Sequence, residues 1–209
     1  MSNPVLNDDA SLNEAEADPN PFKQFEIWFQ EAQRVVPILP NAMTLATSTK
    51  EGVPSSRVVL LKGFDERGFV FYTNYESQKG RELEANPICA LSFYWSQLAR
   101  QIRITGRVTR TTRAESEAYF HTRPFDSQLG AWASNQSEVI SGRGVLEERM
   151  KELIAQYEGK TVPLPPYWGG FRAEPYLFEF WQNRNSRLHD RLRYKPIGDG
   201  RWSMERLSP

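Results

Sequence analysis

The sequence predicts an α+β domain built on an antiparallel β-barrel with flanking helices. Between residues 42 and 108, short segments rich in β-branched and aromatic residues follow one another and are joined mainly by turns. Only one short helix is expected among them, which favours a Greek-key-like antiparallel barrel over a doubly wound parallel sheet. The 209 residues suffice for one domain with a sizeable core, and we see no internal repeat.

The two ends of the N-terminal region differ in composition. Residues 1–19 contain five acidic side chains and no basic one, which predicts a disordered acidic leader. Asn20 and Pro21 are typical of an N-cap and a first helical position. An amphipathic helix to about Val35 follows, with four aromatic residues at helical spacing: Phe22, Phe25, Trp28 and Phe29. We expect residues 20–209 to form a single domain.

The remaining elements follow from the same patterns. Strands are expected at residues 43–47, 56–61, 69–73, 88–94 and 101–108, and again around 176–181, 188–194 and 202–206. Residues 65–68 form a hairpin turn. Hydroxyl caps at Ser77 and Thr112 begin helices that end near residues 85 and 122, and a longer helix is expected at 144–157.

Composition limits the class of function. The formal net charge is zero, but residues 20–209 hold 26 basic and 21 acidic side chains, which suits anionic small ligands. The basic residues are too scattered to indicate a nucleic-acid-binding face. No apolar run is long enough for a membrane span. The single cysteine, Cys89, cannot form an internal disulfide and lies in an apolar run, which is typical of a core residue in a reducing cytoplasm.

Several common catalytic sites are excluded. Two histidines and one cysteine are too few for a zinc site. No Gly-x-Gly-x-x-Gly or Gly-x-Ser-x-Gly motif is present. Gly159-Lys160-Thr161 resembles the end of a P-loop, but Ile154 occupies the place of its first glycine. An enzyme with this sequence would therefore take its difficult chemistry from a bound organic cofactor.

Two segments suggest a first anion site. The strand from Arg57 to Lys62 has a cation at each end, and strand alternation places the two on opposite faces unless a bulge brings them together. Two strand-end charges reaching solvent would look the same. Tyr72 and Thr73 end the next strand, and Lys79 lies in the first turn of the following helix, which together suit a phosphate. A plain capped helix explains these residues almost as well.

Two further groups suggest a second phosphate and a planar ring. Hydroxyl and guanidinium donors surround a helix end, and small polar donors follow: Tyr119, Arg123, Ser127, Gln136 and Ser137. Near the C-terminus, Trp181 precedes Arg187, His189 and Arg191, a combination that suits a planar phosphorylated ligand. An exposed basic strand is the alternative. Alternation along such a strand would place residues 187, 189 and 191 on one face.

Taken together, these segments resemble the pyridoxine (pyridoxamine) 5'-phosphate oxidase family. The resemblance runs from about Asn20 to Pro209 in family order and spacing. It is carried by RVVLLKGFD, FVFYTNYESQKGREL, RQIRITG, YFHTRPFDSQLGAWASNQS, VPLPPYWGGF, EFW and RLHDR.

The resemblance implies an FMN-binding split β-barrel that works as a cytoplasmic homodimer, with FMN held between subunits. Family members oxidise pyridoxamine 5'-phosphate or pyridoxine 5'-phosphate to pyridoxal 5'-phosphate. A hydride equivalent passes from the substrate's C4' carbon to flavin N5, and dioxygen reoxidises the flavin and gives hydrogen peroxide. No metal is implied.

The resemblance also assigns roles to residues. The FMN contacts would be Arg57, Val58, Val59, Leu60, Leu61, Lys62, Tyr72, Thr73, Lys79, Gln101, Gln136, Ser137, Trp181 and Arg191. The substrate phosphate would meet Lys62, Tyr119, Arg123 and Ser127. The catalytic pair, Arg187 and His189, would lie over the pyridine ring on the side away from the flavin.

Three departures from the family pattern concern the same sites. Gln78 stands where many members have arginine, which removes one cation from the flavin phosphate site. Residues 182–186 differ from the common Gln-Gly run, and the leader lacks the Arg and Tyr that some relatives fold over the substrate. Two alternatives remain: a related flavin oxidase acting on an aromatic substrate, as in phenazine-making relatives, and a non-catalytic flavin or pyridoxal-phosphate carrier.

Overall fold

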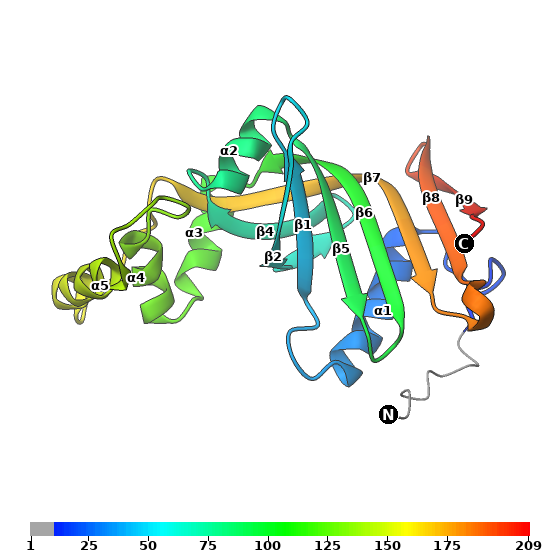
Figure 1. Ribbon diagram of the computed structural model, residues 1–209, viewed down its shortest axis with the longest axis horizontal. Helices are drawn as coiled ribbons and strands as arrows, with labels where there is room; N and C mark the ends of the chain where they lie inside the picture. The colour runs from blue at the N-terminus through cyan, green and yellow to red at the C-terminus, as the bar shows by residue number, and fades with distance from the viewer. Residues whose placement is uncertain (1–10) are drawn as a thin grey trace.

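A computed structural model describes residues 11–209 of the chain. Within this range, nine strands form one antiparallel sheet with the order β2-β1-β5-β6-β7-β4-β3, to which β8 and β9 are added through β7 (Figure 1). The strands are β1 (Ala42–Ser48), β2 (Pro54–Leu60), β3 (Gly63–Asp65), β4 (Gly68–Asn74), β5 (Ile88–Trp95), β6 (Arg100–Arg110), β7 (Trp168–Gln182), β8 (Asp190–Gly198) and β9 (Arg201–Arg206). The predicted antiparallel α+β architecture is confirmed.

The described residues also form five α-helices. They are α1 (Pro21–Val35), α2 (Gln78–Ala85), α3 (Arg113–His121), α4 (Phe125–Ala133) and α5 (Arg143–Tyr157). Helices α3 to α5 lie together at one end of the long axis, and β8 and β9 lie at the other (Figure 1). Across residues 11–209, no helix combines the length and apolarity that a membrane crossing would require.

The sheet curls so that the β2 edge approaches β4, near the opposite edge of the strand order. After β2, the Leu61 amide donates to the Asn41 carbonyl at 2.9 Å, and the Lys62 amide donates to the Val70 carbonyl of β4 at 2.8 Å. Strand β7 is the longest and pairs with β6 along most of its length, with β4 near its start and with β8 near its end. A single strand thus joins both ends of the molecule.

Helix α1 covers the main core with its aromatic stripe. The Asn20 side chain accepts from the Phe22 amide and caps the helix, as its sequence predicts. Phe25 is fully buried, and its ring centroid lies 4.8 Å from those of Phe64 and Phe69 and 5.2 Å from that of Phe93. These edge-to-face contacts fix the helix across the curled sheet.

A second, smaller core supports the helical end. Its buried members are Phe120, Leu129, Val162, Leu164 and Trp168. The proline-rich connector before β7 therefore packs against α3 and α4, which holds those helices beside the start of β7.

The prediction of a disordered leader is wrong for residues 11–19. Leu12 and Ala17 are buried, the Tyr194 hydroxyl donates to the Asp18 carbonyl at 3.0 Å, and Arg206 forms an ion pair with Glu14. The acidic residues of this segment include Glu14, which pairs with the basic Arg206 of β9. The segment therefore packs on β8 and β9. Residues 1–10, the other part of the predicted leader, lie outside the described residues.

Three other expectations are corrected at the level of elements. Helix α4 occupies residues 125–133, where the sequence analysis expected only donors around a helix end. Strand β7 begins at Trp168, eight residues before the expected start. Residues 185–187 form a 3-10 turn and β8 begins only at Asp190, so Arg187, His189 and Arg191 do not share the face of one strand.

Replacing Phe25 by alanine tests the packing of α1. The change removes a fully buried ring and leaves a cavity, so we expect the free energy of unfolding in urea to fall by about 3–5 kcal/mol. Ile27 lies on the same helix with 52% of its surface exposed, and Ile27→Ala should cost about 0.5 kcal/mol or less. Equal losses for the two variants would contradict this account of the core.

Candidate functional site

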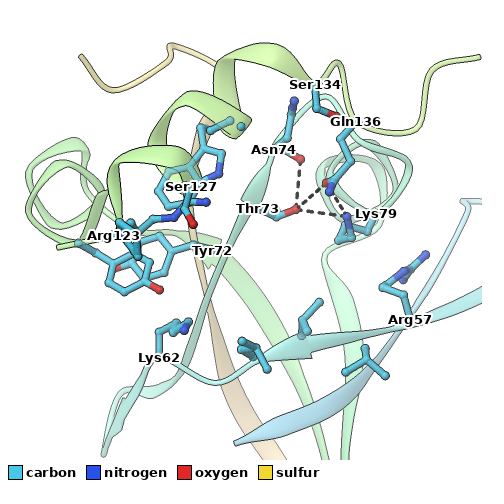
Figure 2. Close-up of a pocket in the computed structure, with 18 residues that line it drawn as sticks. Arg57, Lys62, Tyr72, Thr73, Asn74, Lys79, Arg123, Ser127, Ser134 and Gln136 are labelled. Carbon is cyan, nitrogen blue, oxygen red and sulfur yellow. Dashed lines mark hydrogen bonds between the residues drawn. The ribbon is translucent and has the colours of Figure 1, made fainter. Parts of the chain in front are cut away.

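A cavity of about 770 Å³ opens between β2, β4, α2, α3, α4 and the loop after α4 (Figure 2). It gathers most of the residues that the sequence analysis selected, from segments far apart in the chain. These are Arg57, Val58, Val59, Leu60, Lys62, Tyr72, Thr73, Lys79, Tyr119, Arg123, Ser127 and Gln136. The two predicted anion sites therefore belong to one cavity.

Lys79 lies at one end of the cavity in the first turn of α2. Ser77 caps the helix by accepting from the Gly80 amide, as predicted. The Lys79 ammonium donates to Gln136 Oε1 at 2.9 Å and to Thr73 Oγ1 at 3.3 Å (Figure 2). It also donates to Ser77 Oγ at 3.2 Å. Its partners are neutral oxygens, and no ion pair to Lys79 occurs within residues 11–209.

This environment changes the acidity of Lys79. Burial, assisted by the positive charge of Arg57, lowers the pKa of the Lys79 ammonium to about 8. A buried ammonium that has no carboxylate as an ion-pair partner is poorly stabilised in its charged form. This end of the cavity is therefore suited to an anion, which would supply the missing negative charge.

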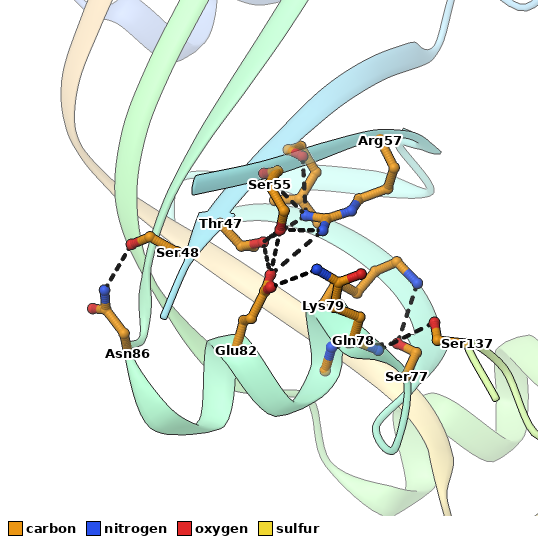
Figure 3. A network of polar contacts seen from close by, with 12 residues as sticks. Thr47, Ser48, Ser55, Arg57, Ser77, Gln78, Lys79, Glu82, Asn86 and Ser137 are labelled. Carbon is orange, nitrogen blue, oxygen red and sulfur yellow. Dashed lines mark hydrogen bonds and ion pairs between the residues drawn. The ribbon is translucent and has the colours of Figure 1, made fainter. Parts of the chain in front are cut away.

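Glu82 accounts for the position of Arg57 beside Lys79 (Figure 3). The buried Glu82 carboxylate accepts from Thr47 at 2.5 Å and Ser55 at 2.6 Å, and it pairs with Arg57 at 3.4 Å. Burial alone would raise the pKa of Glu82, but hydrogen bonds from Ser55, Thr47 and Gln78, with the charge of Arg57, lower it to about 2. Glu82 therefore forms its ion pair with Arg57, and Lys79 receives from it only a weaker, through-space attraction.

Gln78 and Ser137 complete this end of the site. The Gln78 side-chain amide donates to Glu82 at 2.9 Å, and the Gln78 backbone amide donates to Ser137 Oγ at 3.2 Å. Ser137 thus lies at the start of α2 but does not line the cavity. The uncharged Gln78 directs its side chain toward Glu82, so Lys79 is the cation that remains at the helix start.

Arg123 lies at the other end of the cavity. Its Nη1 is the one buried side-chain nitrogen or oxygen in the described part of the chain that has no hydrogen-bond partner. Its guanidinium carbon lies 4.7 Å from the Trp168 ring centroid, and burial lowers the pKa of Arg123. A half-buried guanidinium whose buried Nη1 has an unused donor calls for an anionic acceptor.

Aromatic stacking positions the residues around Arg123. The Tyr119 ring lies 4.1 Å from that of Tyr72 at an angle of 17°, and Tyr72 lies 5.4 Å from Trp168 at 9°. Lys62 Nζ lies 5.6 Å from the Tyr119 ring. The stack brings a hydroxyl and a second cation near Arg123, and Ser127 lines the same region from α4.

Five of the expected site residues form a separate group that does not line the cavity. Gln101 on β6 lies opposite Trp181 on β7, which in turn lies opposite Arg191 on β8. Directly opposed residues share a sheet face, so these three form one row. The His189 ring lies 4.7 Å from that of Trp181, and Arg187 is exposed in the adjoining turn.

The distance between this second group and the cavity is large. Trp168 borders the cavity and Trp181 belongs to the second group, and both lie on β7. Thirteen residues of extended strand put roughly 40 Å along the chain between these two tryptophans. The β2 side of the cavity is nearer, since Val58 lies four strands from Glu179 of β7 in the register of the sheet, roughly 20 Å. Figure 1 likewise places β8 and α4 at opposite ends of the molecule. One chain therefore divides the expected residues between two separate places.

Two of the expected site residues have other contacts in the structure. Leu61 is buried in the main core and does not line the cavity. Arg191 is already engaged, because its Nε and Nη2 lie 2.9 Å from the Glu179 carboxylate. Trp168 and Glu82 received no role from the sequence. The spacing of Gln78 and Glu82 on one helix face was the only signal for the latter.

Replacing Lys79 by methionine tests the unbalanced charge. The folded pKa of about 8 lies below the ordinary 10.5, so above pH 8 the unfolded chain holds the proton more tightly. The stability of the wild-type protein should therefore rise relative to Lys79→Met by about 1.4 kcal/mol per pH unit between these values. Urea unfolding of ligand-free protein from about pH 7 to 10 measures the difference. A difference that stays constant with pH would refute the assignment.

Comparisons with known proteins agree with the resemblance. Residues 29–157 match the family "Pyridoxamine 5'-phosphate oxidase", and residues 168–209 match "Pyridoxine 5'-phosphate oxidase C-terminal dimerisation region". The chain is 56% identical over 199 residues to the pyridoxine/pyridoxamine 5'-phosphate oxidase of Trichormus variabilis, which covers 95% of this chain and 93% of that protein. It is 58% identical over 200 residues to that of Rubrobacter xylanophilus, with 96% and 92% covered.

Solved structures confirm the predicted split barrel. PhzG from Burkholderia lata, solved with tetrahydrophenazine-1-carboxylic acid, superposes with a TM-score of 0.89 at 33% identity and covers 96% of this chain and 98% of its own. A pyridoxamine 5'-phosphate oxidase-related, FMN-binding protein from Nostoc punctiforme gives 0.71 at 18% identity, with 96% and 100% covered, and shows the fold alone. By its sequence and its fold, the chain belongs to the pyridoxamine 5'-phosphate oxidase family.

Proposed function

We propose that this protein is an FMN-dependent oxidase that converts pyridoxamine 5'-phosphate and pyridoxine 5'-phosphate to pyridoxal 5'-phosphate. The observation that carries the proposal is a pair of cations in one cavity, the buried Lys79 and the half-buried Arg123 with its buried Nη1. Neither has an acidic partner within residues 11–209. Two phosphorylated ligands, a flavin and a vitamin, would supply an anion to each.

The Lys79 end fits the FMN phosphate. Lys79, the capped start of α2 and the guanidinium of Arg57 converge there, and helix starts favour phosphates. The volume of about 770 Å³ lies in the range of cofactor sites. Arg57 to Leu60 and Lys62, with Tyr72, Thr73 and Gln136, would hold the rest of the cofactor, and Ser137 would support the start of α2.

The Arg123 end fits the phosphate of the substrate. Arg123 offers an unused, buried donor, and Lys62 offers a second positive charge. Tyr119 and Ser127 add hydroxyl donors of the kind that complete a phosphate site. A phosphate bound here would orient the substrate ring toward the middle of the cavity.

The second group of residues would come from a partner copy of the chain. Residues 168–209 match a dimerisation region, and Trp181, Arg187, His189 and Arg191 lie within it. Their separation from the cavity in one chain is what a site shared between two subunits requires. In the proposed homodimer, Arg187 and His189 cover the substrate ring, whereas Trp181, Arg191 and Gln101 approach the flavin.

The protein's own residues then bind and orient, and they exclude water. Bound FMN would supply the redox chemistry, which is acceptance of a hydride equivalent and its transfer to dioxygen. With pyridoxine 5'-phosphate and O2 the products are the aldehyde and H2O2, and with pyridoxamine 5'-phosphate a water molecule is also consumed and ammonia released. Holding two rings in fixed register is the main task of the site.

Two related points favour this proposal over its alternatives. PhzG, at 33% identity, was solved with a phenazine carboxylic acid, which has no phosphate. Arg123 shares its end of the cavity with Lys62, Tyr119 and Ser127, and this many donors and charges suits a dianionic phosphate better than a single carboxylate.

Cys89 is buried, and burial raises its thiol pKa to about 12, which suits a core residue in a reducing, cytoplasmic setting.

The proposal is tested by turnover of the purified protein. With FMN bound, pyridoxamine 5'-phosphate in air should yield equal amounts of aldehyde and hydrogen peroxide. Arg123→Met, which keeps the volume and removes the charge, should lower kcat/KM by about 100-fold or more because charged hydrogen bonds to phosphate are lost. Bound flavin without any turnover of the wild-type protein would sink the oxidase proposal and favour a carrier.

A mixed dimer tests the shared site. Arg123→Ala disables the cavity of its own chain, and Arg187→Ala disables the second group of its own chain. If each site combines residues from two chains, a dimer of one variant with the other contains one intact site. We expect co-expressed, doubly tagged mixed dimers to recover about half of the wild-type turnover, while each variant alone remains inactive. Mixed dimers as inactive as the parents would contradict shared sites.

A further inference from the structure

The turn that presents His189 has a strained backbone. Ser186 and Arg187 both have a positive φ, of 58° and 62°, and neither is glycine. Two consecutive residues in the left-handed region persist only where surrounding contacts hold them. The shape of this turn is therefore imposed by its neighbours.

Asp190 provides those contacts from the first position of β8. Its carboxylate accepts from the Leu12 amide at 3.2 Å and from Arg206 Nη1 at 2.7 Å, and it lies 3.6 Å from Arg184 Nε. Arg206 also pairs with Glu14. One carboxylate thus joins the N-terminal segment, the last strand and the two sides of the turn.

The same turn fixes the hydrogen bonding of the His189 ring. The Arg184 amide donates to His189 Nδ1 at 3.2 Å. A backbone amide can only donate, so Nδ1 has to present its lone pair and carries no proton. The neutral ring then holds its proton on Nε2, which has no hydrogen-bond partner within residues 11–209. Trp181 limits rotation of the ring from one side.

We propose that residues 183–190 hold His189 as the neutral Nε2–H tautomer, so that it donates a hydrogen bond to an oxygen of the substrate and does not act as a general base. Asp190 is the positioning residue for this arrangement. The inference rests on the proposed function in so far as the acceptor is a hydroxypyridine oxygen. The tautomer itself depends only on the geometry of the turn.

Nitrogen NMR of the holoprotein reads the tautomer directly. The chain contains two histidines, so His121→Gln assigns the signals of His189. In 15N-histidine-labelled protein we expect Nδ1 to show the shift of an unprotonated nitrogen and Nε2 that of a protonated one. A protonated Nδ1 with an unprotonated Nε2 would overturn the proposal, whether or not the protein turns over any substrate.

Two substitutions at His189 separate donation from proton abstraction. Glutamine can place an amide N–H near the position of Nε2 but cannot act as a base, whereas alanine can do neither. We expect His189→Ala to lower kcat/KM by about 100-fold and His189→Gln by no more than about tenfold. Equal losses would refute donation. A wild-type protein without turnover would instead defeat the proposed function and leave the NMR result standing.

Substitution of Asp190 tests the positioning role. Asp190→Asn weakens the contacts to Arg206 and the Leu12 amide, so we expect the His189 nitrogen signals to broaden or to report both tautomers. Glu205→Gln is the matched control, because Glu205 pairs with Arg193 on the same strand pair and does not contact Asp190. Unchanged His189 signals in Asp190→Asn would show that this carboxylate does not hold the turn.

Discussion

The site depends on two cations at the ends of one cavity, the buried Lys79 and the half-buried Arg123, neither of which has an ion-pair partner within residues 11–209. A nearby carboxylate would normally neutralise such a group. Glu82 attracts Lys79 through space, but its oxygens are occupied by Thr47, Ser55, Gln78 and Arg57. At the other end, Arg123 faces aromatic rings that offer no charge. The fold thus preserves two positive sites that only anionic ligands would balance.

Strand β7 connects this constraint to the rest of the molecule. Its first residue, Trp168, stacks with Tyr72 beside the cavity, and its close packing there depends on Gly169, where a Cβ would lie 2.1 Å from the Tyr75 hydroxyl. Near the other end of β7 lies Trp181, whose ring is next to that of His189. Because one strand spans both places, each chain presents a cavity at one end and the complementary residues at the other. That arrangement is the physical basis for proposing a site shared between subunits.

The sequence predicted the parts of the site that depend on local chemistry. Ser77 and Lys79 follow helix-capping rules, and Tyr119 and Arg123 flank a helix end, so their grouping could be anticipated. The strand pattern likewise predicted an antiparallel barrel, and the resemblance narrowed it to a split barrel. Residues that act through distant partners were not predictable in this way, because Glu82 gains its role only when β1 and β2 pack over α2.

The errors have the same origin. Residues 11–19 look disordered when read alone, yet Arg206, nearly two hundred residues away, pairs with Glu14 and helps to order them. The alternating pattern of Arg187, His189 and Arg191 suggested a strand, but residues 185–187 form a turn, and Asp190 after it contacts Arg206 and the Leu12 amide. Long-range ion pairs reach both segments, and a local pattern carries no information about them.

A structure determined with FMN and pyridoxal 5'-phosphate bound tests the central claim most directly. The account predicts one phosphate at Lys79 and the start of α2, the other at Arg123, and Arg187 of a second chain over the substrate ring. Phosphates bound away from both cations, or a ring covered by Arg187 of the same chain, would contradict it.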